Sequence, residues 1–276
     1  MKTAGPIGVF DSGYGGLTIL KEFVQLLPQY DYLYLGDNAR APYGNRSFET
    51  VYEYTKECVN FLFSNGCKLV ILACNTASAK ALRTIQQKDL PLMQENLRVL
   101  GVIRPTTEIV GNYTKSQKVG IFATTGTVLS QSYVVEIQKF FPAIEVTQEA
   151  CPMWVPLVEN NEFNKPGADY FVKKHIDSLL SKQPDIDTII LGCTHYPLLV
   201  DKIKSYLPKS ITLLAQGQLV AQSLSDYLTR HPEIEIQCSK NGTQKYLTTD
   251  DAENFNKQAS IFIGASVNST PINLPD

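Results

Sequence analysis

The feature that most constrains the fold of this chain is a repeated alternation of short apolar runs with longer segments of helical spacing. The runs expected to be strands are residues 6–10, 32–35, 69–73, 99–103, 119–123 and 188–191. Helical spacing covers residues 17–27, 48–63, 77–87 and 128–140. The strand candidates lack strict apolar/polar alternation, which is typical of strands covered on both faces. Their order along the chain predicts an α/β fold with parallel sheets and right-handed crossovers.

A short pattern that occurs twice in the sequence predicts that this fold is divided into two lobes. The strand at 69–73 leads into Cys74 and a helix, and the strand at 188–191 leads through Gly192 into Cys193 and another helix. We therefore expect two similar parallel-sheet α/β lobes that enclose a cleft, formed by residues 1–102 with 213–276 and by residues 103–212. Ligands of such folds bind at the carboxyl ends of the strands.

The C-terminal region carries weaker signals. After about residue 206 the pattern predicts a helix at 219–228 and two short strands at 244–248 and 261–263. Their place in the sheet does not follow from the sequence.

Composition excludes several classes of protein. Lys+Arg 25 against Asp+Glu 27 offers no excess of positive charge for nucleic acid or anionic lipid. No stretch approaches the roughly 20 apolar residues of a membrane span, and the N-terminal apolar run is too short for a secretion signal. The six cysteines form no CxxC pair, which argues against a disulfide framework or a zinc site. We expect a cytoplasmic protein with reduced thiols and no bound metal.

The first motif, Asp11-Ser12-Gly13-Tyr14-Gly15-Gly16, lies between a strand and a helix. Its glycines allow a tight turn, and the N–H groups of the following helix favour an anion such as a carboxylate. The motif matches no established phosphate-binding pattern, so an ordinary glycine-rich turn is the competing interpretation. Asp11 favours a functional role, because a carboxylate at a strand end can orient or deprotonate a group in the cleft.

A second loop, residues 36–44, follows the second predicted strand. Its spacing favours a solvated connection in which Asp37 and Arg40 pair. The alternative is that Tyr43 and nearby backbone groups contact a ligand.

The two cysteine segments carry the most specific chemical signal. A thiol at a helix N-terminus has a lowered pKa, because the helix dipole and free N–H groups favour the thiolate. A single buried cysteine is more often a small packing residue than a catalyst. Two cysteines in matching strand-to-helix contexts, Cys74 and Cys193, indicate a paired function. Asn75, Thr76 and Thr194 supply neutral donors beside them.

Of the three histidines, His195 is the candidate for chemistry, since it lies two residues after Cys193 and titrates near neutral pH. His175 and His231 have charged neighbours and are interpreted as surface residues. The remaining cysteines, Cys58, Cys67, Cys151 and Cys238, are assigned to packing or incidental positions.

Six sequence blocks in order resemble the glutamate racemases, within the broader group of aspartate and glutamate racemases. The blocks are IGVFDSGYGG (7–16), LGDNARAPYG (35–44), LACNTAS (72–78), VGIFATTGT (119–127), VPLVE (155–159) and LGCTHYPL (191–198). They extend over roughly the first three quarters of the chain, and their combination is far more specific than any one block. Arg104 departs from the pattern, since relatives often carry Glu there.

The resemblance implies a cofactor-independent enzyme in which Cys74 and Cys193 stand on opposite faces of the α-carbon of glutamate. One thiolate removes the proton, and the opposite thiol returns one. The family implies auxiliary catalytic roles for Asp11 and His195, with Glu159 as the partner of His195. It implies substrate-binding roles for Asp11, Ser12, Tyr43, Gly44, Asn75, Thr76, Thr194 and His195. A homodimer that supplies D-glutamate for peptidoglycan is also implied.

Three rival interpretations remain at this point. A racemase of aspartate or a related compound would use the same two thiols. A Cys-His hydrolase with Cys74 as nucleophile and His195 as base would leave Cys193 without a role. A binding module built like a periplasmic receptor would leave both thiols without one.

Overall fold

The computed structural model describes residues 4–93 and 96–274. The strands are β1 (Ile7–Asp11), β2 (Tyr32–Gly36), β3 (Leu69–Leu72), β4 (Arg98–Gly101), β5 (Lys118–Ala123), β6 (Glu145–Ala150), β7 (Thr188–Gly192), β8 (Thr212–Leu214), β9 (Gln244–Thr248) and β10 (Ser269–Pro271). The helices are α1 (Leu17–Leu26), α2 (Phe48–Ser64), α3 (Asn75–Lys80), α4 (Leu82–Thr84), α5 (Ile103–Thr107), α6 (Thr125–Ser130), α7 (Ser132–Phe140), α8 (Trp154–Glu159), α9 (Pro166–Lys182), α10 (Val200–Tyr206), α11 (Gly217–Arg230), α12 (Pro232–Glu235) and α13 (Ala252–Ile263). Shorter helical turns are Asn38–Arg40, Ile85–Asp89, Leu90–Leu92, Val110–Asn112 and Tyr196–Leu199.

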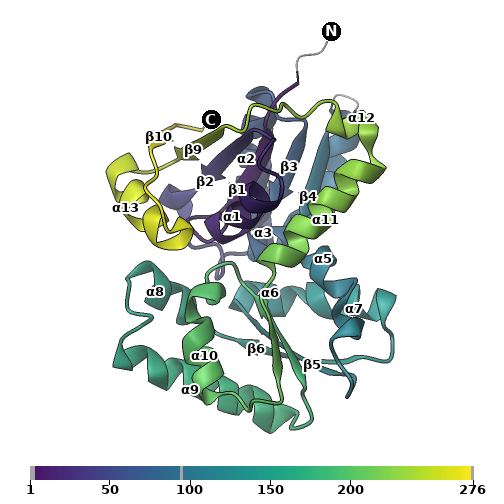
Figure 1. Cartoon of the computed structure of the whole chain (residues 1–276), viewed down its shortest axis with the longest axis vertical. Helices are drawn as coiled ribbons and strands as arrows, with labels where there is room; N and C mark the ends of the chain where they lie inside the picture. The colour runs from purple at the N-terminus through teal and green to yellow at the C-terminus, as the bar shows by residue number, and fades with distance from the viewer. Residues whose placement is uncertain (1–3, 94–95, 275–276) are drawn as a thin grey trace.

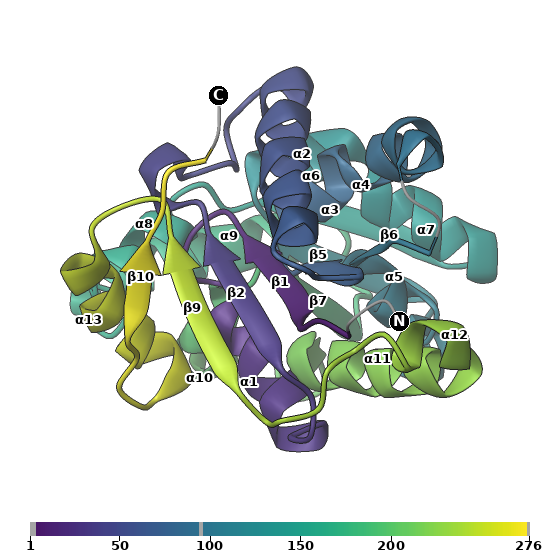
Figure 2. The ribbon, with the colours of Figure 1, turned by 90° about the horizontal axis from the view of Figure 1, so that it is seen from above.

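The larger of two parallel sheets has the strand order β10-β9-β2-β1-β3-β4. Every residue of β1, β2 and β3 is buried, as expected for apolar strands covered on both faces. Helix α2 lies on one face of this sheet, and α1 and α11 lie on the other (Figure 2). The N- and C-terminal parts of the chain therefore meet in one lobe, the upper one in Figure 1.

The second sheet has the order β6-β5-β7-β8 and is also parallel throughout. It forms the lower lobe in Figure 1, with α6 to α10 around it. The chain crosses between the sheets after β4 and returns after β8. Gln216 joins these two crossings, because its Nε2 donates to the carbonyl oxygen of Val102 at 2.9 Å.

The structure confirms the two-lobed parallel α/β fold and most of the predicted strands. The strand predicted at 99–103 ends earlier, at Gly101, because Ile103 already begins α5. The predicted strand at 261–263 is wrong: these residues form the last turn of α13, which ends at Gly264 with a positive φ of 80°. A short apolar run does not by itself distinguish a strand from a buried helix end.

Two predicted helices are interrupted. The helix expected at 77–87 begins at Asn75, breaks at Ala81 and continues as a wider π-turn from Ile85. The helix expected at 128–140 breaks at Gln131, whose φ of 56° is left-handed, and this break separates α6 from α7. Apolar spacing does not report such breaks, because it indicates which residues are buried and not whether the helix between them is continuous. Among the residues described, none of the helices combines the length and apolar character needed to span a membrane.

Candidate active site between the two sheets

One cavity of about 60 Å³ gathers the ends of strands from both sheets. Asp11 ends β1, Cys74 follows β3, and Cys193 follows β7, so parallel strands deliver all three residues from their carboxyl ends. The predicted site residues that line this cavity are Ser12, Tyr43, Gly44, Cys74, Asn75, Thr76, Glu159, Cys193, Thr194 and His195. The structure thus brings together side chains that are separated by up to about two thirds of the chain. Asp11 is fully buried beside them and does not line the cavity.

Cys74 is held at the start of α3 by neutral groups. Its Sγ accepts a hydrogen bond from the backbone N–H of Ala77 at 3.4 Å and lies 3.4 Å from the hydroxyl of Ser12. Burial, followed by the nearby charge of Asp11, raises the pKa of this thiol to about 12. The helix N-terminus was expected to lower the pKa of Cys74, but removal of the sulfur from water outweighs the helix groups.

Cys193 has a different environment. Its Sγ lies 3.9 Å from Nδ1 of His195, and Nε2 of His195 lies 3.0 Å from a carboxylate oxygen of Glu159. Burial alone would lower the pKa of His195, but the hydrogen bonds with Cys193 and Glu159 raise it to about 10. The imidazole therefore carries its proton at neutral pH and places a positive charge beside the Cys193 sulfur.

Asp11 lies outside the cavity lining and hydrogen-bonds to residues of both lobes. One carboxylate oxygen accepts the N–H of Gly13 at 2.8 Å, and the other accepts the hydroxyl of Thr194 at 3.4 Å. Burial raises the pKa of Asp11, while the positive charge of His195 opposes that shift. The carboxylate is thus near both thiol segments without being exposed to solvent.

Neutral side chains supply the remaining polar surface. Thr76 Oγ1 lies 3.0 Å from Thr124 Oγ1 across the two lobes. Asn75 accepts a hydrogen bond at Oδ1 from the hydroxyl of Tyr133, at 2.7 Å. The buried Nδ2 of Asn75 has no partner in the part of the chain that the structure describes. Among the described residues that line the cavity there is no Lys or Arg, so the donors available to an anionic ligand are the His195 imidazole and neutral groups.

The loop at 36–44 departs from the solvated connection that its spacing favoured. Arg40 pairs with Asp37 as expected, at 2.7 Å, but Asp37 is fully buried and also accepts the hydroxyl of Tyr43. The Tyr43 side chain is thereby turned to Asp37. The backbone of Gly44 contacts the other lobe, since its carbonyl oxygen accepts the N–H of Gly126 at 2.8 Å.

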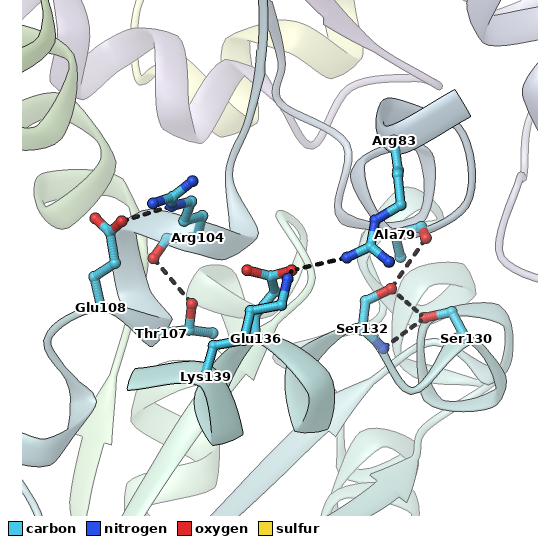
Figure 3. A network of polar contacts seen from close by, with 9 residues as sticks. All are labelled: Ala79, Arg83, Arg104, Thr107, Glu108, Ser130, Ser132, Glu136 and Lys139. Atoms are coloured by element: carbon cyan, nitrogen blue, oxygen red, sulfur yellow. Dashed lines mark hydrogen bonds and ion pairs between the residues drawn. The ribbon is translucent and has the colours of Figure 1, made fainter. Parts of the chain in front are cut away.

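Of the other assignments made from the sequence, some are confirmed and one is wrong. Cys151 packs as predicted, yet it also lines the cavity. His175 is not a surface residue: it is 7% exposed and its Nδ1 lies 2.7 Å from Glu149. The face of α9 that carries it was not predicted, so its burial was missed. Arg104 pairs with Glu108 at 2.6 Å, as Figure 3 shows.

Sequence reasoning missed the contribution of Thr124, Thr127 and Tyr133 from the second lobe. The signal was partly present, because Thr124 and Thr127 fall in the VGIFATTGT block and Tyr133 is a large polar residue within the helix predicted at 128–140. In the described ranges, no group of three or more His, Cys, Asp or Glu side chains is arranged to hold a metal ion. What the geometry offers is two thiols on one cavity, one beside neutral groups and one beside a cation.

Comparison with known proteins places this geometry in context. A family model described as Asp/Glu/Hydantoin racemase matches residues 7–224. The glutamate racemase of Ruegeria sp. (strain TM1040) is 40% identical over 93% of this chain and 96% of its own length. The crystal structure of a glutamate racemase from Bacillus anthracis superposes with a TM-score of 0.89 at 35% identity, covering 98% of both chains. That of the glutamate racemase from Francisella tularensis in complex with D-glutamate gives 0.87 at 30% identity, again over 98% of both chains.

Proposed function

Since the chain belongs to the Asp/Glu/hydantoin racemase family, and within it to the glutamate racemases, we propose that it interconverts L- and D-glutamate without a cofactor. The observation that carries this proposal is the meeting of Cys74 and Cys193, from different sheets, on one cavity. A racemase needs a base on one side of the α-carbon and an acid on the other, and two thiols from facing lobes meet that need. The substrate class follows from near-full-length similarity to glutamate racemases.

In the proposed reaction, the Cys193 thiolate takes the α-proton of L-glutamate as the Cα–H bond breaks. The Cys74 thiol then gives its proton to the opposite face, which yields D-glutamate and leaves Cys74 as the thiolate. The reverse reaction starts from that thiolate. Burial raises the pKa of Cys74 and keeps it protonated, which suits Cys74 to act as the acid when Cys193, beside the His195 imidazole, acts as the base.

The auxiliary roles are proposals of the same kind. Asp11 and His195 assist the two thiols, and Glu159 holds His195 through the bond at its Nε2. The groups that line the cavity and bind the glutamate are Ser12, Tyr43, Gly44, Asn75, Thr76, Thr194 and His195. Asp11, the remaining predicted binding residue, does not line the cavity and acts on the ligand through Gly13 and Thr194, which it holds in place. Because the Tyr43 hydroxyl is bound to Asp37, we assign Tyr43 to the site through its backbone and ring. Fixed neutral dipoles in a closed site are suited to stabilising the charge that develops at the α-carbon.

The lobe boundaries follow the sheets, with one adjustment. We propose residues 1–102 and the segment after Leu214 as the lobe carrying Cys74, and residues 103–214 as the lobe carrying Cys193. Pairing of β8 with β7 supports moving the second boundary from 212 to 214. A homodimer, a cytoplasmic location and a supply of D-glutamate to peptidoglycan synthesis remain predictions that rest on family resemblance.

The deciding experiment is incubation of L-glutamate with the purified protein in D₂O. We expect optical activity to decay while deuterium enters the α-carbon, with no added metal or pyridoxal phosphate and after dialysis against a chelator. L-Aspartate is incubated in parallel, and faster exchange of its α-proton than of that of glutamate would favour the aspartate racemase alternative. Absence of α-deuterium from glutamate, or a requirement for an added cofactor, would overturn the proposal.

A further inference from the structure

Tyr133, in the second lobe, contacts both thiol-bearing segments. Its hydroxyl donates to Oδ1 of Asn75, the residue that follows Cys74 in the first lobe. Its ring lies against Gly192, the residue before Cys193, where an added Cβ would stand 3.1 Å from the Tyr133 Cε2. Tyr133 is fully buried, so both contacts are made away from solvent.

The helix that carries Tyr133 is fastened to the first lobe on either side of it. The hydroxyl of Ser132 donates to the carbonyl oxygen of Ala79 at 3.0 Å, and Glu136 pairs with Arg83 at 3.3 Å. Figure 3 shows these contacts between α7 and the turn formed by α3 and α4. The position of Tyr133 relative to Asn75 is therefore set by flanking bonds as well as by its own.

The contact with Tyr133 engages one end of the Asn75 amide. A phenol hydroxyl paired with an amide can donate to the oxygen, which leaves the NH₂ group on the opposite side. Here Oδ1 faces Tyr133, while the buried Nδ2 has no partner among the described residues and Asn75 lines the cavity. A buried donor without a hydrogen-bond partner costs free energy in the empty protein. A bound ligand that accepts a hydrogen bond from this donor removes that cost.

Ionisation does not disturb this arrangement. Burial raises the pKa of Tyr133 above its ordinary value, although a hydrogen bond with Gln216 partly opposes the shift. Tyr133 thus remains a donor through the working pH range. Gln216 also bonds to Val102 at the crossing between the lobes, so the hydroxyl adjoins the segments where one lobe meets the other.

We propose that Tyr133 is a positioning residue that orients the Asn75 amide so that its Nδ2 donates to a carboxylate of the bound amino acid. The inference rests on the proposed function for the identity of that ligand. Tyr133 itself touches no substrate atom in this scheme. Its effect is on binding, because an amide that can rotate presents its oxygen to the empty cavity part of the time and must turn before its NH₂ group can donate to a carboxylate.

The test is Tyr133→Phe, which removes the hydroxyl and keeps the ring against Gly192. We expect KM for both enantiomers to rise roughly tenfold, the scale of one lost neutral hydrogen bond, with kcat changed by less than about threefold. The matched control is Tyr32→Phe, which removes a buried hydroxyl bonded to the Leu27 carbonyl at 3.0 Å, outside the cavity. We expect Tyr32→Phe to lower the thermal stability about as much as Tyr133→Phe does and to leave KM unchanged.

A double-mutant cycle with Asn75→Ala separates positioning from a general structural role. If Tyr133 acts through Asn75, the double variant should have the same KM as the single variant Asn75→Ala. An unchanged KM in Tyr133→Phe, an equal further rise in the double variant, or a Tyr133→Phe protein that does not fold would each overturn the inference. Failure of the wild-type protein to exchange the α-proton of glutamate would instead overturn the proposed function.

Discussion

Sγ of Cys193 lies 3.9 Å from Nδ1 of His195, whereas the polar groups at Cys74 are the neutral Ser12 hydroxyl and Ala77 N–H. Similar strand-to-helix segments in the two lobes thus give their thiols unlike surroundings. Burial and the nearby charge of Asp11 raise the pKa of Cys74, so this thiol keeps its proton, while the Cys193 sulfur faces the imidazole of His195. The two cysteines therefore differ in their neighbours although they play equivalent parts in the proposed reaction.

We predict that the two thiols divide the work by face of the substrate. Replacing either cysteine with serine should nearly abolish racemisation, because a hydroxyl is far less acidic than a thiol, while leaving the fold intact. With a glutamate analogue bearing a β leaving group, elimination needs only the first proton abstraction. Cys74→Ser should then eliminate the leaving group from the L form, and Cys193→Ser should eliminate it from the D form. Release of the eliminated product measures both reactions. Processing of the same enantiomer by both variants would contradict the assignment.

The pH dependence of kcat/KM should be bell-shaped, because the proposed reaction needs one thiol ionised and the other protonated in each direction. The His195 pKa is raised to about 10, so its proton is held below that pH and lost as pH rises through it. Loss of that proton removes the positive charge that faces the cavity, where negative charge develops during proton abstraction, so activity should fall above about pH 10. Cys74, with a pKa of about 12, stays protonated across that range. A rate profile in buffers from pH 6 to 11 that climbs to a plateau beyond 10 would refute this account.

Glu159 should act on the rate through His195. Glu159→Gln removes a carboxylate that raises the His195 pKa, so the alkaline limb of the profile should move to lower pH. We also expect kcat/KM at neutral pH to fall roughly tenfold, as for a lost charge-assisted hydrogen bond. Glu162→Gln, an exposed carboxyl three residues on, is the matched control and should leave the profile in place. An unmoved alkaline limb in Glu159→Gln would mean that Glu159 does not tune His195.

Thermal stability should increase in Gln131→Gly. Gln131 adopts φ of 56° at the break between α6 and α7, a conformation that costs a non-glycine residue about 1 kcal/mol. The variant should raise the free energy of unfolding by a few tenths to about 1 kcal/mol, measured by denaturant titration. Gln138→Gly, at an exposed position within α7, should instead lower it by about 1 kcal/mol. A loss of stability in both variants would show that the side chain of Gln131 outweighs its backbone strain.

Much of the molecule follows from local pattern alone. The apolar runs that became β1, β2, β3, β5 and β7 are evident because buried parallel strands need continuous apolar sequence. Cys74 and Cys193 stood out because each follows such a strand and opens a helix. The meeting of the two in one cavity was expected from the carboxyl-end rule for parallel sheets, and the structure has both lining it.

Tertiary structure decided what local pattern does not encode. The chain places Asp11 in full burial, sets His195 between Cys193 and Glu159, and so makes the surroundings of the two thiols unlike. It also brings Tyr133 onto Asn75 across 58 residues of sequence. A residue's charge state and hydrogen-bond partner depend on burial and on neighbours from distant segments, and neither quantity is carried by spacing along the chain. The sequence therefore determined which residues enter the site, and packing between the lobes determined what each can do there.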